Sequence, residues 1–241
     1  MIVLFTDFGL DGPYTGQMKA VLRGGAPAAE LIDLFADAPA GDPRAGAYLL
    51  AAYAAWFPPG TVFLCVVDPG VGGARASVVI EADRRWYVGP ENGLFEMVLR
   101  RAQNARCFEI VWRPESLSAS FHGRDLFAPV AAMLARGERP ALRARAPARQ
   151  PDWPDDLAAI VYIDHYGNAL TGLRAGAVPA SATLVLGDKT RVIHGATFSA
   201  VPEGAAFWYE NSNGLVEIAV NRGRADAALG LAIGSTFTVT T

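Results

Sequence analysis

The chain of 241 residues carries a formal net charge of −3 and is half apolar, which suffices for a substantial core. This acidic balance excludes the basic surface with which proteins bind nucleic acid or an anionic membrane. The longest apolar run, residues 47–57, is too short to span a bilayer, and the first residues lack the basic start of a signal peptide. We therefore expect a cytoplasmic protein with neither nucleic acid nor membrane as a partner.

The first half of the chain alternates strand-like and helix-like segments. Asp42 and Pro43 have the residue types of an N-cap and a first helical position, and Gly24-Gly25 those of a helix end. The alternation favours an α/β layered domain with a mainly parallel sheet over residues 1–137. Strands are predicted at residues 2–6, 30–35, 61–67, 77–81, 86–88 and 107–112, and helices at residues 13–23, 43–57, 94–101 and 125–136.

A change in composition follows this half. Residues 138–156 hold four prolines and several arginines without an apolar period, which predicts a linker. Many short strands separated by turn residues then indicate a small β-barrel or sandwich over residues 157–241. These strands are predicted at residues 158–163, 183–186, 191–194, 206–209, 216–220 and 236–240, with one helix at residues 225–229.

Five short polar segments, each with a glycine, follow or lie beside predicted strands. Loops at strand ends are where α/β scaffolds hold ligands, so five of them in one chain suggest one composite site. The segments are TDFG (6–9), VDPGVG (67–72), FHGRD (121–125), IDHYGN (163–168) and NSNG (211–214).

The segment that begins at Asp68 is the first candidate for chemistry. Taken alone, Asp68-Pro69-Gly70 is most simply a turn. The glycine-rich run continues to Arg75, however, and so places an acid and a guanidinium seven residues apart (75 − 68 = 7). It lacks the Lys-Ser/Thr that ends a phosphate-binding loop.

A histidine in a polar, glycine-bearing loop is the second candidate. One of only three histidines, His122, lies next to Gly123, which makes it a better candidate than an isolated histidine. We interpret Arg124 and Asp125 as a structural ion pair in which Asp125 caps the following helix.

Several further residues have side chains suited to ligands. Asp7 is either a helix N-cap or an acceptor for sugar hydroxyls. Amide, carboxylate and hydroxyl groups at Asp164, Asn168 and residues 211–213 suit a purine edge or an amino-acid head group, although such residues also form turns. Tyr166 and Phe198 could stack on a base or belong to the core.

The sequence holds no signal for a metal centre. His, Cys and carboxylate residues nowhere have ligand spacing, so we expect no metal site and no cofactor. Cys65 and Cys107 lie far apart in apolar runs and are expected to be core thiols.

Together with PENGL (90–94), the five segments occur in an order that resembles the S-adenosyl-L-methionine (SAM) hydroxide adenosyltransferase family, the SAM hydrolases, which are relatives of the fluorinase and chlorinase. The resemblance runs from Thr6 to about Gly223. It implies an N-terminal α/β domain, a C-terminal β-barrel, and a homotrimer with each site at a subunit interface. The implied reaction is attack of water or hydroxide on the ribose C5′ of SAM, which yields adenosine and L-methionine without a cofactor.

The same resemblance implies roles for individual residues. Asp68, Arg75 and His122 match the set that holds the nucleophilic water, and we hypothesise that Asp68 and His122 share the role of proton acceptor while Arg75 orients them. The other matched positions are Asp7 at the ribose hydroxyls, Asn168 and Phe198 at the adenine, Asp164 and Ser212 at the methionine, and Glu217 and Val220 along the nucleoside pocket; Tyr166 and Asn211 are added as substrate-binding candidates from their residue types.

Two alternative functions remain open from the sequence. A halogenase is disfavoured because the Asp68 carboxylate would repel a halide, and because Asp68, Val71 and His122 stand where the fluorinase pattern has hydroxyl side chains. A non-catalytic nucleoside-binding protein would use the same loops. Leu170-Thr171-Gly172 also departs from a Thr-Asn pair frequent in the family, which bears on the choice of adenosyl sulfonium substrate.

Overall fold

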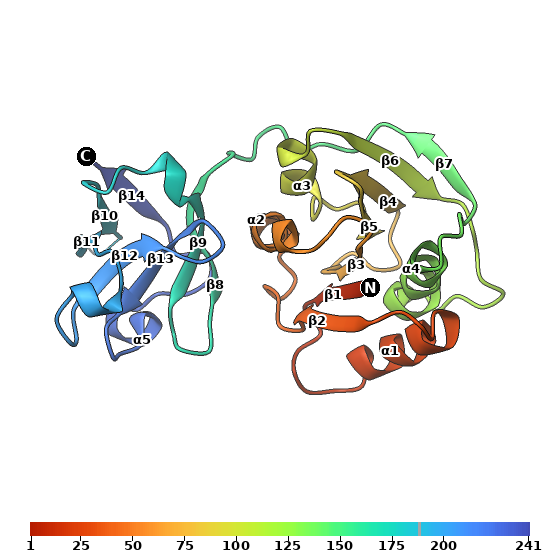
Figure 1. The fold of residues 1–241 in the computed structure, drawn as a ribbon, viewed down its shortest axis with the longest axis horizontal. Coiled ribbons are helices and arrows are strands. Elements are labelled where there is room, and N and C mark those ends of the chain that lie inside the picture. Colours follow the sequence, from red (N-terminus) through yellow and green to blue (C-terminus); the bar gives the residue numbers. More distant parts are fainter. Residues whose placement is uncertain (188) are drawn as a thin grey trace. The chain divides into compact units, whose positions relative to one another are not determined.

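Within residues 1–187 and 189–241, which the computed structural model describes, the strands form two seven-stranded sheets (Figure 1). Each sheet organises one of two compact units, Met1–Gln150 and Pro151–Thr241. The fold is therefore an α/β unit followed by a mainly β unit, as the sequence predicted.

The sheet of the first unit has a parallel part and an antiparallel part. Its strand order is β2-β1-β3-β5-β4-β6-β7, and the first four of these strands run parallel to one another. Strands β4 and β5 form an antiparallel hairpin at the positions of the strands predicted at residues 77–81 and 86–88. The strands are β1 (Ile2–Thr6), β2 (Leu31–Phe35), β3 (Val62–Val66), β4 (Ser77–Ala82), β5 (Arg85–Pro90), β6 (Ala105–Ile110) and β7 (Leu142–Arg145).

Helices cover both faces of this sheet. On one face, α1 (Tyr14–Gly25) and α4 (Ala128–Ala135) enclose a core with alternate residues of the strands, such as Leu4. On the other face, α2 (Pro43–Tyr53) approaches Phe5, the next residue of β1, and packs beside α3 (Glu96–Arg101) (Figure 1). Because both faces are covered, β1 and β3 are buried along their whole length.

Two local predictions for this unit concern the start of α2 and the end of α1. The Asp42 side chain accepts a hydrogen bond from Ala45 N–H (3.0 Å) and caps α2, as predicted. Helix α1 ends at Gly25, within the predicted Gly24-Gly25 pair, but the residue that caps it is Ala26, whose N–H donates to the Leu22 carbonyl. Gly25 serves close packing instead: a Cβ there would lie 2.9 Å from the Cβ of Ala132 on α4.

The segment predicted as a linker is partly a strand. Within residues 138–156, β7 pairs with β6, so Leu142–Arg145 belongs to the first sheet, and the two units divide between Gln150 and Pro151. Exposed arginines alternating with small residues hid this edge strand, because it buries little apolar surface.

The second unit is a nearly closed barrel. Its strand order is β14-β10-β11-β12-β13-β9-β8, and a bridge between Ala159 and Thr236 brings the two ends of the sheet together. The elements are β8 (Leu157–Ile163), β9 (Ala169–Arg174), β10 (Thr183–Leu186), β11 (Arg191–His194), β12 (Ala206–Glu210), β13 (Leu215–Val220), α5 (Ala225–Leu229) and β14 (Phe237–Thr240). Strand β9 was not predicted, because its buried residues 169–173 (ALTGL) contain Thr and Gly and lack the long run of large apolar side chains that marks residues 61–67.

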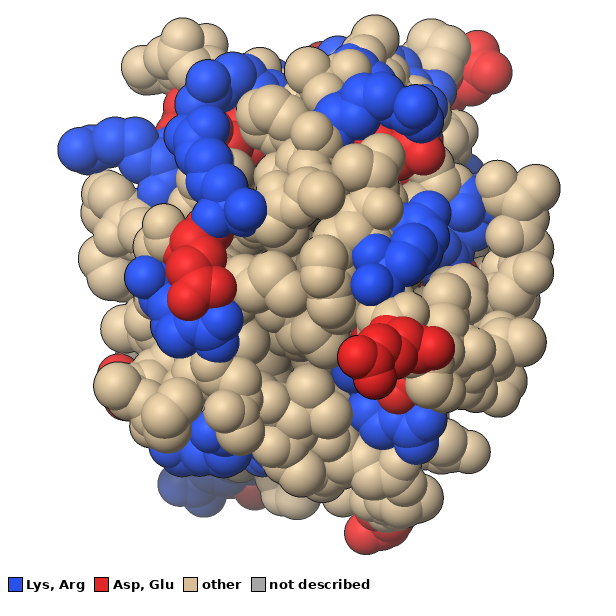
Figure 2. Space-filling model, turned by 90° about the vertical axis from the view of Figure 1, so that its right-hand side faces the viewer, with Lys and Arg blue, Asp and Glu red and all other residues tan. Residues whose placement is uncertain are grey.

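The surface shows charges of both signs in proximity. On the face drawn in Figure 2, Lys and Arg side chains lie beside Asp and Glu side chains, and apolar or neutral residues separate the groups. None of the described helices combines the length and the apolar composition that crossing a lipid bilayer requires. Both cysteines are buried, as expected of core thiols.

Candidate active site

Two carboxylates leave the first sheet side by side. Strands β1 and β3 are parallel neighbours with Thr6 opposite Val66, so Asp7 and Asp68 both emerge at the same edge. A pocket of about 120 Å³ lies between these loops and the loop that carries His122. Its lining residues are Asp7, Phe8, Val66, Asp68, Pro69, Val71, Ser120, Phe121, His122 and Gly123.

Asp68 and Arg75 form a two-point ion pair across the glycine-rich loop. Arg75 Nε donates to Asp68 Oδ1 (2.9 Å), and Nη2 donates to Oδ2. The side chains are only 3 % and 11 % exposed, and Arg75 Nη1 also donates to Ser77 Oγ (3.2 Å). A forked guanidinium–carboxylate pair of this kind fixes the orientation of the carboxylate as well as its charge.

The same guanidinium also determines the state of His122. Arg75 Nη2 lies 3.2 Å from His122 Nδ1. Because a guanidinium has only donors, Nδ1 must accept, so the imidazole is neutral and carries its proton on Nε2. Burial, and then the positive charge of Arg75, lower the pKa of His122 and favour this neutral form. Nδ1 is therefore already engaged, so the ring group that His122 can offer to a ligand is the Nε2–H donor.

A phenylalanine beneath this group was not recognised in the sequence. The centre of the Phe127 ring lies 5.4 Å from the guanidinium carbon of Arg75. The same ring lies edge-on to the His122 imidazole, with 6.5 Å between the two ring centres. Phe127 ends a π-helical turn, Gly123–Phe127, that begins directly after His122. Such turns often occur at functional sites because they re-aim a side chain at a helix end.

The ion pair between Arg124 and Asp125 is present, but Asp125 does not cap the next helix. Its Oδ2 accepts from Ser118 N–H (2.9 Å) instead, which holds the loop before His122. That loop approaches the glycine-rich loop closely, because a Cβ on Gly72 would lie 2.6 Å from the carbonyl oxygen of Ala119.

Asp7 is half-buried at the edge of the pocket. Gly41 N–H donates to its Oδ2 (2.9 Å), and the carboxylate retains lone pairs for a further donor. Burial raises the pKa of Asp7, and the negative charge of Asp68 raises it further. Both carboxylates line the same pocket.

The second unit places Asp164 and Asn168 in direct contact. Asn168 donates to Asp164 through its backbone N–H (2.8 Å) and through Nδ2 (3.0 Å), while Asp164 N–H donates back to the Asn168 carbonyl (3.0 Å). Gly167, between them, has φ +84°, which this tight turn between β8 and β9 requires.

A buried carboxylate organises a second polar group in this unit. Glu217 accepts from Asn211 Nδ2 (2.9 Å) and from the Tyr209 hydroxyl (2.5 Å). Asn211 Oδ1 in turn accepts from the backbone N–H groups of Asn213 and Leu215, which shapes the loop that carries Ser212. Burial raises the pKa of Glu217, against the effect of these hydrogen bonds, and nearby Asp164 adds to the rise.

The aromatic candidates differ in their surroundings. Phe198 lies edge-on to Tyr209 at 5.5 Å and keeps part of its surface exposed. Tyr166 is 73 % exposed, whereas Val220 is buried in the barrel core. Within the second unit the structure thus brings Asp164 to Asn168, and Glu217 to Asn211 and Tyr209.

Comparison with protein-family models identifies both units. Residues 2–143 match the SAM hydroxide adenosyltransferase N-terminal domain, and residues 158–238 match the C-terminal domain of the same family. The chain belongs to the SAM hydroxide adenosyltransferase family.

The similarity of this SAM hydroxide adenosyltransferase family member to individual proteins extends over nearly the whole chain. A protein of Thermus thermophilus named (R)-S-adenosyl-L-methionine hydrolase is 40% identical over 97% of this chain and 96% of its own length. A protein of Salinispora arenicola with the same name is 35% identical over 98% and 95%. A crystal structure of an uncharacterized conserved protein from Thermotoga maritima superimposes with a TM-score of 0.85 at 30% identity, and covers 100% of both chains.

Three residues of this family member contact candidate-site residues or their neighbours but were not identified as candidates in the sequence. Phe127 and Tyr209 lie inside predicted secondary structure, where an aromatic residue is most simply part of the core. Asn92 lies in the PENGL segment, which supported the resemblance but received no role. The motif itself was the signal that could have drawn attention to it.

Proposed function

We propose that this protein hydrolyses SAM to adenosine and L-methionine. The observation that carries the proposal is the hydrogen-bonded set of Asp68, Arg75 and neutral His122, in which Asp68 and His122 line a small pocket that also contains Asp7. The names of the relatives support the same substrate and suggest its R sulfonium epimer.

The chemistry of a sulfonium substrate suits these residues. The water oxygen forms a bond to C5′ while the C5′–S bond breaks, and the electron pair of the broken bond stays on sulfur. Methionine therefore leaves as a neutral thioether and needs no acid catalyst. The enzyme must instead hold a water molecule in line with the C5′–S bond, and such positioning contributes about 7–11 kcal/mol to lowering a barrier.

We assign complementary roles to the three side chains. Asp68 accepts the proton of the attacking water, and the Nε2–H of His122 donates to a lone pair of the water oxygen and orients it. Arg75 holds both partners and stabilises the negative charge that develops on the nucleophile.

The pocket favours water over a halide as nucleophile. A halide in contact with a carboxylate oxygen of Asp68, whose side chain is 3 % exposed, would be repelled and could offer it no hydrogen bond. Water can donate a hydrogen bond to the same carboxylate.

The remaining candidate residues are proposed as substrate contacts. Asp7 has lone pairs for the ribose hydroxyls, and the polar groups of the second unit offer donors and acceptors to the rest of the substrate. In this proposal Asn168, Tyr166 and Phe198 contact the adenine, Asp164, Asn211 and Ser212 the methionine, and Glu217 and Val220 shape the nucleoside pocket.

We also propose a cytoplasmic homotrimer in which the first unit of one chain and the second unit of a neighbouring chain share each site. The exposed apolar side chains of Leu10 and Tyr14, close in sequence to the pocket residues Asp7 and Phe8, support burial against another chain. Light scattering of the purified protein should give three times the chain mass of 25.5 kDa.

The reaction is tested by incubating the protein with each SAM epimer in ¹⁸O-labelled water and separating the products. We expect adenosine and methionine from the R epimer, with ¹⁸O in the adenosine and no dependence on chloride or fluoride. A halide-dependent product would support a halogenase. Tight adenosine binding without turnover of either epimer would support a nucleoside-binding protein.

An isosteric variant tests the role of Asp68. Asp68→Asn should lower kcat by about 10²-fold or more, because the proton acceptor is lost. The matched control is Asp33→Asn, since Asp33 pairs with Lys19 on the solvent-exposed side of β2 and should keep wild-type turnover. Near-wild-type turnover of the Asp68 variant would remove Asp68 from the mechanism.

A further inference from the structure

One loop, Pro90–Leu94, touches both ends of the loop that carries Asp68 and Arg75. Asn92 Nδ2 donates to the carbonyl of Val67 (2.8 Å), the residue before Asp68. The backbone N–H of Glu91 donates to the carbonyl of Ala76 (3.0 Å), the residue after Arg75. The PENGL segment is therefore hydrogen-bonded to the residue before Asp68 and to the residue after Arg75, at the two ends of the loop that carries this ion pair.

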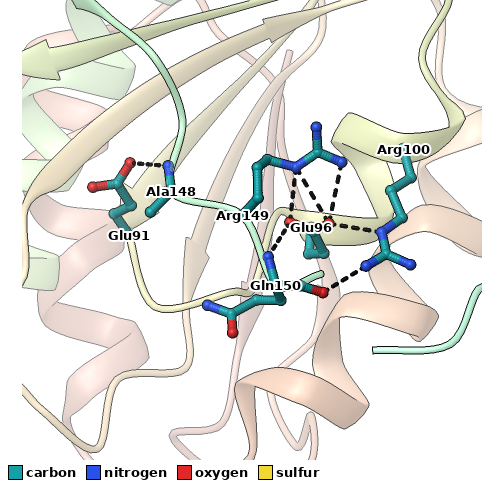
Figure 3. A network of polar contacts seen from close by, with 6 residues as sticks. All are labelled: Glu91, Glu96, Arg100, Ala148, Arg149 and Gln150. Atoms are coloured by element: carbon teal, nitrogen blue, oxygen red, sulfur yellow. Dashed lines mark hydrogen bonds and ion pairs between the residues drawn. The ribbon is translucent and has the colours of Figure 1, made fainter. Parts of the chain in front are cut away.

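This bracing loop is itself held from behind, as Figure 3 shows. Ala148 N–H donates to Glu91 Oε1 (2.9 Å). At the start of α3, Glu96 has a side chain that is 1 % exposed and receives hydrogen bonds from Arg100, Arg149 and the backbone N–H of Gln150. The loop is thus hydrogen-bonded on one side to Val67 and Ala76 and on the other to Ala148.

The contact of Asn92 acts on a rigid group. The Val67 carbonyl belongs to the planar peptide unit that also contains the N atom of Asp68, so fixing the carbonyl direction fixes the start of the Asp68 residue. Val67 is fully buried, and its carbonyl gains a specific donor from Asn92. The Asn92 side chain is oriented in turn, because its Oδ1 accepts from Leu94 N–H (3.3 Å).

We infer that Asn92 is a positioning residue that holds Asp68 and Arg75 in their orientation toward His122. This inference rests on the proposed SAM hydrolysis and assigns a role to the PENGL segment. Asn92 acts on the reaction through the Val67–Asp68 peptide, so its loss should slow the chemical step more than it weakens substrate binding.

The kinetic test compares Asn92→Asp with wild type. The variant keeps the size and the Oδ1 acceptor but loses the donor to Val67. We expect kcat for SAM to fall about 10- to 100-fold, with KM and the Kd of adenosine within about threefold of wild type. Unchanged kcat in a folded variant would overturn the inference.

Thr61→Val is the matched control. Thr61 Oγ1 donates to the Pro58 carbonyl (2.8 Å) at the opposite end of β3, so this variant also removes one side-chain donor from a loop carbonyl. It should lower the thermal midpoint while leaving kcat within about twofold. If both variants lose kcat in proportion to their lost thermal stability, Asn92 is merely structural and the inference fails.

A second measurement does not depend on turnover. In Asn92→Ala, which adds no charge, the NMR titration of His122 should shift to higher pH because the Arg75–His122 contact loosens. The chain has three histidines, so His122→Asn identifies the signal. An unshifted titration would overturn the inference even if wild type proved inactive toward SAM, whereas a shift in an inactive protein would reject the hydrolase and retain the positioning role.

Discussion

His122 Nδ1 accepts a hydrogen bond from the same Arg75 nitrogen that binds Asp68 Oδ2. Arg75 therefore lies between an acid and an imidazole and couples their orientations. A change in the charge or position of any one of these three groups must therefore alter the other two. Arg75 contacts both Asp68 and His122, so its state determines how the two are oriented.

The pH dependence of turnover follows from the neutral state of His122. Protonated Nδ1 cannot accept from Arg75, so kcat/KM, which reports ionisation of the free enzyme, should decline as the pH falls through the pKa of His122. Since burial and the charge of Arg75 hold that pKa below its ordinary value of 6.5, the acid limb should have its midpoint below pH 6.5 and the profile should be flat above it.

A pH–rate profile of His122→Asn supplies the control for this prediction. The asparagine Oδ1 can still accept from Arg75 but does not titrate, so the residual turnover should lack the acid limb. A wild-type limb centred above pH 6.5, or one that persists in the variant, would assign the titration to another group.

The substitution Arg75→Lys keeps the positive charge but loses the planar guanidinium that binds both oxygens of Asp68. An ammonium cannot bind both oxygens of Asp68 in one plane and His122 Nδ1 as well. We expect kcat to fall about 10²-fold with little change in KM, as measured by initial rates with SAM. Arg143→Lys, which alters an exposed pair with Glu109, should retain wild-type kinetics; equal losses in both variants would contradict a specific role.

Gly72→Ala should disturb the contact between the glycine-rich loop and the loop before His122. Gly72 has φ +79°, and the added Cβ would lie 2.6 Å from the Ala119 carbonyl oxygen, so one of the loops must shift. We expect kcat to fall at least about 10-fold.

The matched control for that clash is Gly60→Ala. Gly60 has φ +87° but nothing within 4 Å of an added Cβ, so it bears the same backbone cost of about 1–2 kcal/mol without the steric conflict. Urea unfolding should show a loss of stability in both variants, and only the Gly72 variant should lose turnover. Wild-type kcat in Gly72→Ala would show that the two loops move independently.

Glu96→Gln should destabilise the first unit. Burial opposes ionisation of Glu96, but hydrogen bonds from Arg149, Arg100 and Gln150 outweigh it and hold the pKa of Glu96 below its ordinary value. Glutamine keeps one acceptor oxygen but removes the buried charge that Arg100 and Arg149 bind, at a cost of about 2–4 kcal/mol in the free energy of unfolding at pH 7, discounted because Arg149 is half exposed.

The pH dependence of this effect has a definite sign. Because the folded-state pKa of Glu96 is depressed, its contribution is present above the ordinary value of 4.5 and is lost as the pH falls below it. The difference between wild type and Glu96→Gln in urea unfolding should therefore shrink toward pH 3.5. Glu138→Gln, at an exposed pair with Arg136, should show almost no difference at either pH.

Much of the fold followed from local patterns. The apolar run at residues 61–67 and the Asp42-Pro43 pair predicted β3 and the start of α2, because strand burial and helix capping depend on a few adjacent residues. β7 and β9 were missed for different reasons: β7 is exposed and rich in arginine, and β9 is a short buried segment that contains Thr and Gly.

The sequence by itself determined the residue types of the candidate site and, through the order of its motifs, the family. Only the tertiary structure decided how those residues meet. Parallel pairing of β1 with β3 brings Asp7 and Asp68 to the same end of the sheet, and the approach of Arg75 to His122 sets a neutral imidazole with its proton on Nε2. Hydrogen bonds between residues 47 positions apart, as these two are, depend on packing, and local sequence cannot encode their geometry.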